Sequence, residues 1–130
     1  MGRILIDTSV LVAIERGEVK AADVLASADG AVSVISVSEL LHGVFRAQTP
    51  VRQRRRRSAE ILLQRLETLP ITEEVARLHA ELGAELASDG ITVPVNDFWI
   101  GCTALTENAA VATRDARSFS RIPGLHVIAA

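Results

Sequence analysis

The chain has 130 residues, of which 48% are hydrophobic, so it has enough apolar material for one domain with its own core. This composition excludes an intrinsically disordered chain, and the single cysteine, Cys102, excludes a disulfide framework and indicates a reducing, cytoplasmic location. The net charge is −2, but five arginines lie between positions 52 and 57, and without them the remainder carries −7. Because no apolar run reaches the length of a membrane-spanning helix or a signal sequence, we expect neither a membrane anchor nor export.

Short apolar segments alternate with amphipathic segments along the chain. In chain order, the pattern predicts a strand at 3–6, helices at 10–15 and 21–28, a strand at 31–35, helices at 36–47 and 50–66, an extended piece at 69–71, helices at 73–89 and 96–105, and strands at 110–113 and 126–128. Strands that are short, apolar and separated by helices are typical of a parallel sheet covered on both faces. We therefore expect a single α/β domain over residues 1–130, a three-layer α/β/α sandwich with a short, mostly parallel central sheet.

Four carboxylates occupy related positions in these predicted elements. Asp7 ends the first strand, and Asp115 follows the strand at 110–113. Glu39 and Asp97 lie in the first turns of the predicted helices at 36–47 and 96–105. Because ligands of open parallel sheets bind beyond the carboxyl ends of the strands, we expect the four acids to meet at one edge. Like charges raise one another's pKa, and Mg²⁺ or Mn²⁺, which prefer carboxylate oxygens, would relieve that repulsion.

Each acid also has a purely structural interpretation. Asp7 and Asp115 precede predicted helical turns and are suited to capping them. Asp97 is suited to the positive end of its helix dipole, and the spacing of Ser36 and Glu39 matches a capping box. These interpretations explain the acids one at a time, but they do not require all four to share one edge of a sheet.

Four segments of the sequence match one known family in the order that this family has them. They are IDTSVL at 6–11, SELLHG at 38–43, NDFWIGCTAL at 96–105, and ATRD at 112–115 followed by Phe119 and IPGL at 122–125. On these segments the chain resembles the PIN-domain ribonucleases and, within them, the VapC-type toxins of bacterial toxin–antitoxin pairs. The resemblance covers the whole chain, and it implies a PIN-like fold.

The resemblance implies a metal-dependent endoribonuclease that hydrolyses RNA phosphodiester bonds. It assigns the acidic cluster around Mg²⁺ or Mn²⁺ to Asp7, Glu39, Asp97 and Asp115, with Asp7 and Asp97 as first choices for metal ligands, and it assigns supporting hydroxyls to Ser9 and Thr113. Glu39 would orient the attacking water or accept its proton. Many relatives have asparagine at the position of Asp115 and an acid three residues later, where this chain has Ser118. The resemblance also implies a cognate antitoxin protein and a homodimer as partners.

The basic run has three interpretations. It consists of Arg52, Arg54, Arg55, Arg56 and Arg57. Such a cluster is suited to RNA phosphates or to an acidic surface of a partner chain, and it is equally typical of a solvated helix face.

Two other classes of protein compete with the nuclease. A non-catalytic nucleic-acid-binding or interaction module with a PIN-like fold would bind RNA without cleaving it, whether or not metal is present. A phosphatase with Asp7 as its nucleophile usually has a second acid two residues later, where this chain has Ser9. A phosphate-receiver module needs a lysine near the cleft, and the only lysine, Lys20, is poorly placed for that role.

Overall fold

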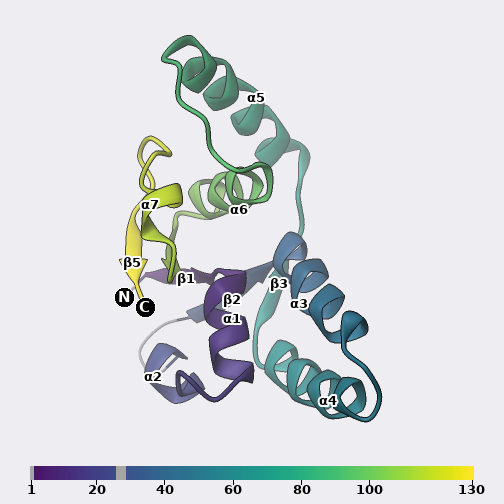
Figure 1. The fold of residues 1–130 in the computed structure, drawn as a ribbon. Coiled ribbons are helices and arrows are strands. Elements are labelled where there is room, and N and C mark those ends of the chain that lie inside the picture. The colour runs from purple at the N-terminus through teal and green to yellow at the C-terminus, as the bar shows by residue number, and fades with distance from the viewer. Residues whose placement is uncertain (1, 26–28) are drawn as a thin grey trace.

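The computed structural model describes residues 2–25 and 29–130, and its centre is a parallel sheet (Figure 1). The strands in these ranges are β1 (Arg3–Ile6), β2 (Asp29–Ser33), β3 (Glu67–Leu69), β4 (Ala109–Thr113) and β5 (Val127–Ala129). They are arranged in the order β3-β2-β1-β4-β5, and every neighbouring pair is parallel. Because β1 is central, its carboxyl end lies between those of β2 and β4, and the segments that follow these strands share one edge.

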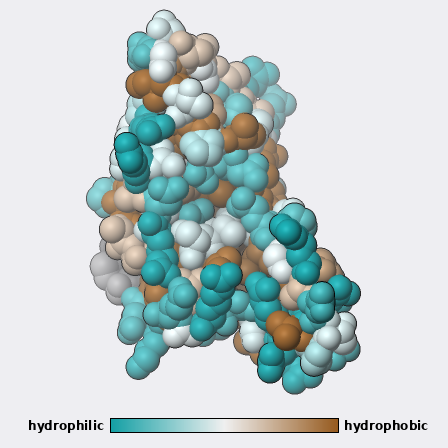
Figure 2. Space-filling view, in the orientation of Figure 1, coloured by the Kyte–Doolittle hydropathy of each residue, from teal (hydrophilic) through white to brown (hydrophobic). Residues whose placement is uncertain are grey.

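Helices cover both faces of this sheet. They are α1 (Thr8–Glu15), α2 (Ala21–Leu25), α3 (Val34–Arg46), α4 (Val51–Gln64), α5 (Glu73–Ser88), α6 (Val95–Thr106) and α7 (Ala116–Phe119). Leu5 of β1 packs into a core cluster with α5, α6 and α7, whereas its neighbour Ile6 packs into a second cluster with α1, α3 and α4. Since successive side chains of a strand point to opposite faces, the two clusters are the two interlayer cores. Outside these cores, the face of the molecule in Figure 2 carries hydrophilic side chains with hydrophobic ones among them. The predicted three-layer α/β/α sandwich is confirmed.

The second strand and the following helix begin two residues earlier than predicted. The strand ends at Ser33, which is the N-cap of α3, and its hydroxyl accepts a hydrogen bond from the backbone N–H of Ile35 at 3.0 Å. The capping box predicted for Ser36 and Glu39 is therefore wrong, because Ser36 lies buried inside the helix. Glu39 is in the second turn of α3 instead of the first.

The other elements differ from prediction mainly at their ends. β3 lies two residues before the predicted extended piece, and β5 begins one residue later than predicted. The segment at 116–119, which the sequence suggests is a turn, forms the short helix α7. The predicted helix at 21–28 corresponds to α2, and its last three positions lie outside the described residues. Within the described ranges, no helix is long and apolar enough to cross a membrane.

Candidate active site

Asp7 is a buried carboxylate at the carboxyl end of β1. Only 5% of the residue is exposed, and its backbone N–H donates to the carbonyl oxygen of Ala112 on β4 at 2.9 Å. Its Oδ2 accepts hydrogen bonds from the Ser9 hydroxyl at 2.7 Å and the Thr113 hydroxyl at 2.9 Å. Asp7 occupies the N-cap position of α1, but its side chain makes no capping hydrogen bond. The carboxylate is thus oriented by two hydroxyls that leave its Oδ1 available, and the capping interpretation is wrong.

Ser9 and Thr113 also connect Asp7 to the loop after β4. The Ser9 hydroxyl accepts from the backbone N–H of Arg114 at 3.0 Å, and the Thr113 hydroxyl accepts from that of Asp115 at 2.8 Å. Each hydroxyl donates to the carboxylate and accepts from the loop, so its hydrogen position is fixed by both partners. These two residues, which the sequence singles out as supporting groups, lie directly beside Asp7.

Glu39 is held by the neighbours of two other acids. Its Oε1 accepts from the Thr8 hydroxyl at 2.6 Å, and its Oε2 accepts from the Asn96 side-chain amide at 3.1 Å. Thr8 follows Asp7 in the chain, and Asn96 precedes Asp97. These two bonds tie α3 to the N-terminal turns of α1 and α6. Neither Thr8 nor Asn96 was predicted from the sequence to have a role, although each lies next to a candidate acid in the chain.

Asp97 is the acid whose pKa the other three influence. It lies in the first turn of α6, where burial raises the pKa of its carboxyl group from 3.8 to about 6 with further contributions from the charges of Asp7, Asp115 and Glu39. Such a shift means that the ionised form of Asp97 lacks compensating positive charge. The structure therefore brings the four sequence-predicted acids into one electrostatic group at the edge of the sheet.

Asp115 is the most exposed of the four acids. It occupies the N-cap position of α7 without a side-chain capping bond, and its Oδ2 accepts from the Ser118 hydroxyl at 3.0 Å. In this chain, the position three residues later thus supplies a hydrogen-bond donor to Asp115.

All four side chains offer hard oxygen ligands, which is the donor set that Mg²⁺ and Mn²⁺ prefer. Their uncompensated negative charge also suits a cation. As the side chains stand, no three histidine, cysteine or acidic residues in the described ranges are arranged to hold a metal ion. The cluster fits a divalent cation in chemistry and charge, and its side chains are not closed around one.

The five arginines of the basic run do not form one uniform surface. In α4, the side chain of Arg55 turns inward and donates to the Glu15 carboxylate at 2.9 Å. Arg52 donates to the carbonyl oxygen of Ala47 at 2.9 Å, and the guanidinium of Arg56 lies 5.3 Å from the ring centre of Phe45. The remaining two, Arg54 and Arg57, are exposed and make no side-chain hydrogen bond or ion pair within the described ranges.

Comparison with known proteins identifies the family. The model of the PIN domain matches residues 4–125. The chain belongs to the PIN domain family. A protein of Mycobacterium tuberculosis named Ribonuclease VapC4 is 37% identical over 126 residues, which are 97% of this chain and 95% of that protein. The family resemblance expected from the sequence is confirmed.

Solved structures of VapBC complexes contain chains with a similar fold. A crystal structure of VapBC2 from Rickettsia felis bound to a DNA fragment from their promoter matches with a TM-score of 0.86 and 26% identity, over 96% of each chain. The structure of VapBC-5 from Mycobacterium tuberculosis matches with a TM-score of 0.79 and 30% identity, over 100% of each chain. Because the matches extend over nearly the whole chain, they include the elements that carry all four acids.

Proposed function

We propose that residues 1–130 form one nuclease domain, a metal-dependent endoribonuclease that hydrolyses RNA phosphodiester bonds and acts as the toxin of a toxin–antitoxin pair. The observation that carries this proposal is the acidic cluster at the carboxyl edge of the sheet, in which the pKa of Asp97 is raised to about 6. Relatives named Ribonuclease VapC support the reaction, and the VapBC structures support the biological role. The single cysteine and an RNA substrate are consistent with a cytoplasmic location.

The four acids would have different roles in this reaction. Asp7 and Asp97 would hold a Mg²⁺ or Mn²⁺ ion, with Glu39 and Asp115 completing the acidic cluster. When bound, such an ion lowers the pKa of a water molecule and stabilises negative charge on the phosphate. Asp7 is presented by two hydroxyl donors, so its carboxylate needs little reorganisation. Glu39, held by Thr8 and Asn96, would accept a proton from an attacking water.

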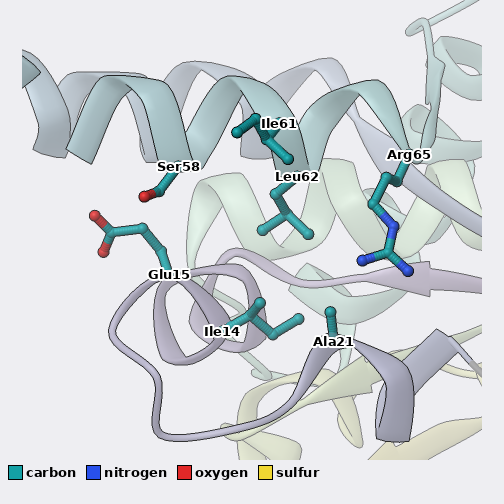
Figure 3. A pocket seen from close by; sticks show the side chains of 7 residues that line it. All are labelled: Ile14, Glu15, Ala21, Ser58, Ile61, Leu62 and Arg65. Atoms are coloured by element: carbon teal, nitrogen blue, oxygen red, sulfur yellow. The ribbon is translucent and has the colours of Figure 1, made fainter. Parts of the chain in front are cut away.

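The partner that we propose is an antitoxin protein, and a second copy of the chain would complete a homodimer. An apolar cavity of about 270 Å³ between α1, α2 and α4 offers a contact surface to either of these two partners. Figure 3 shows Leu62 of α4 pointing toward Ile14 of α1 across this cavity, with Glu15 and Ser58 toward one end and Arg65 toward the other; Ile61 also lines it. Ile61 is 56% exposed, and covering it would bury apolar surface that now contacts water.

The test is RNA cleavage by the purified chain, freed of any copurifying protein, with a pool of structured RNAs in Mg²⁺, Mn²⁺ or EDTA. We expect cleavage that needs metal and that is lost in Asp7→Asn. Cleavage should persist in Glu85→Gln, which removes one carboxylate charge at an exposed position of α5. Circular dichroism of each variant shows whether it is folded. Folded protein that binds RNA equally with metal or EDTA and never cleaves it would refute the nuclease and favour the non-catalytic binding module.

A further inference from the structure

Three arginines from three different helices line one pocket outside the acidic cluster. The pocket has a volume of about 320 Å³ and is lined by Arg16, Gly43, Arg46, Ala47 and Arg55. Arg16 is the C-cap of α1, Arg46 is the last residue of α3, and Arg55 lies in the second turn of α4. A Cβ atom at Gly43 would lie 3.7 Å from Nη2 of Arg55, so Gly43 packs directly beside this guanidinium.

The pocket carries an excess of positive charge. Arg55 is neutralised by Glu15, whose side chain is only 3% exposed and accepts from Nε at 2.9 Å. Arg16 and Arg46 are exposed and form no ion pair within the described ranges. Two unpaired guanidinium groups around an open pocket are suited to a phosphate, which they can bind in a bidentate manner.

The pocket lies at the C-terminal ends of two helices that also contribute to the acidic cluster. Near the cluster, Thr8 in the first turn of α1 donates to Glu39 in the second turn of α3 at 2.6 Å. Toward the pocket, α1 ends at Glu15 with Arg16 as its C-cap, and α3 ends at Arg46. Gly43 and Arg46 follow Glu39 by four and seven residues, so they lie on the same face of α3. At a rise of 1.5 Å per residue, the two sites are about 10–12 Å apart along the helices.

We propose that this arginine pocket binds a backbone phosphate of the RNA whose scissile bond lies at the acidic cluster. The inference rests on the proposed nuclease function. Four carboxylates repel a polyanion, so the affinity for RNA must come from cationic groups at a distance from the cut. A distance of about 10–12 Å is short enough for one RNA strand to contact both sites at once. A cationic pocket at this distance from the acidic cluster favours a nucleic-acid chain over an acidic protein segment.

The test compares two double variants that remove the same charge. Arg16→Gln/Arg46→Gln changes the pocket, and Arg77→Gln/Arg121→Gln changes two exposed arginines that do not line it. A short fluorescein-labelled single-stranded RNA of mixed sequence is titrated in EDTA, which prevents metal-dependent cleavage, at several salt concentrations. Each lost phosphate contact lowers the slope of log K against log[salt] by about 0.7, so the pocket variant should lose about 1.4. The control should keep a slope close to that of the unmodified protein.

A cleavage assay in Mg²⁺ separates this inference from the proposed function. The pocket variant should show a raised KM with kcat nearly retained, because the acids are untouched. Equal salt slopes and equal KM values for the two double variants would overturn the proposal that the pocket binds an RNA phosphate, even if the protein cleaves RNA. The inference also fails if the pocket variant binds RNA normally but loses affinity for its antitoxin. A changed slope in a protein that never cleaves RNA would retain the phosphate site while refuting the nuclease.

Discussion

Replacing Asp97 with asparagine should stabilise the fold while abolishing RNA cleavage. Burial and the charges of Asp7, Asp115 and Glu39 raise the pKa of Asp97 from 3.8 to about 6. A rise of about two pKa units corresponds to about 3 kcal/mol against the ionised form in the folded state. Because Asp97 is only partly buried, solvent screening reduces this to about 1–2 kcal/mol. Asp97→Asn removes the charge with little change in shape. The free energy of unfolding of the variant should therefore be higher than that of the unmodified protein by about 1–2 kcal/mol.

The stability that Asp97→Asn gains over the unmodified protein should depend on pH. The folded state binds the Asp97 proton more tightly than the unfolded state, so ionisation of Asp97 lowers stability as pH rises. The loss begins as pH passes the unfolded value of 3.8 and is complete above the folded value of about 6. The difference in the free energy of unfolding between Asp97→Asn and the unmodified protein should therefore be largest near neutral pH and should decrease toward pH 4.

Urea denaturation in EDTA across this pH range measures the difference, with Glu85→Gln as a control for charge removal elsewhere. Adding Mg²⁺ should stabilise the unmodified protein, because a ligand that binds only the folded state raises its stability, and it should stabilise Asp97→Asn much less. If Asp97→Asn is no more stable at neutral pH, or if its advantage does not shrink on acidification, then the like-charge account of the cluster is wrong.

Two substitutions and one labelling experiment test other parts of the structure. Thr113→Val removes a hydroxyl that orients Asp7, so RNA cleavage should slow by about tenfold in a single-turnover assay, and an unchanged rate would show that the hydroxyl is not needed. Arg55→Met leaves the Glu15 carboxylate buried without its partner and should cost about 2–3 kcal/mol by urea denaturation, most of which adding Glu15→Gln should restore. Burial raises the pKa of the Cys102 thiol to about 11, so iodoacetamide should label it only after unfolding, as measured by mass spectrometry, and rapid labelling of the native chain would contradict its burial.

The acids of the site could be predicted because their positions follow from topology. Asp7 directly follows β1, Asp115 lies two residues after the end of β4, and parallel strands of one sheet end at the same edge. What the sequence did not locate was the start of α3, since Val34 and Ile35 are β-branched residues typical of strands. They form the first turn of the helix because Ser33 caps it and Ile35 packs against the core cluster beside α5 and α6. Local propensity was overridden there by packing.

The contacts that hold the site together are long-range, and a single sequence does not encode them visibly. Asn96 meets Glu39 across 57 positions, and Arg55 meets Glu15 across 40. The basic run illustrates the consequence. Its charge was obvious, but the direction of each side chain depends on which helix lies beside it. Arg55 turns toward α1 because a buried carboxylate is there, and the pocket that results takes its other two arginines from outside the run.

The balance of charges distinguishes the acidic edge of the sheet from the other buried carboxylate of the domain. Glu15 is buried with an arginine that compensates it. None of Asp7, Glu39, Asp97 and Asp115 forms an ion pair within the described ranges, and their hydrogen bonds come from hydroxyl and amide groups. Neutral donors fix the orientation of a carboxylate but leave its charge in place. The cluster therefore favours an added cation more strongly than a cluster with its own arginine would, and the same charge accounts for the cost to stability that Asp97→Asn should remove.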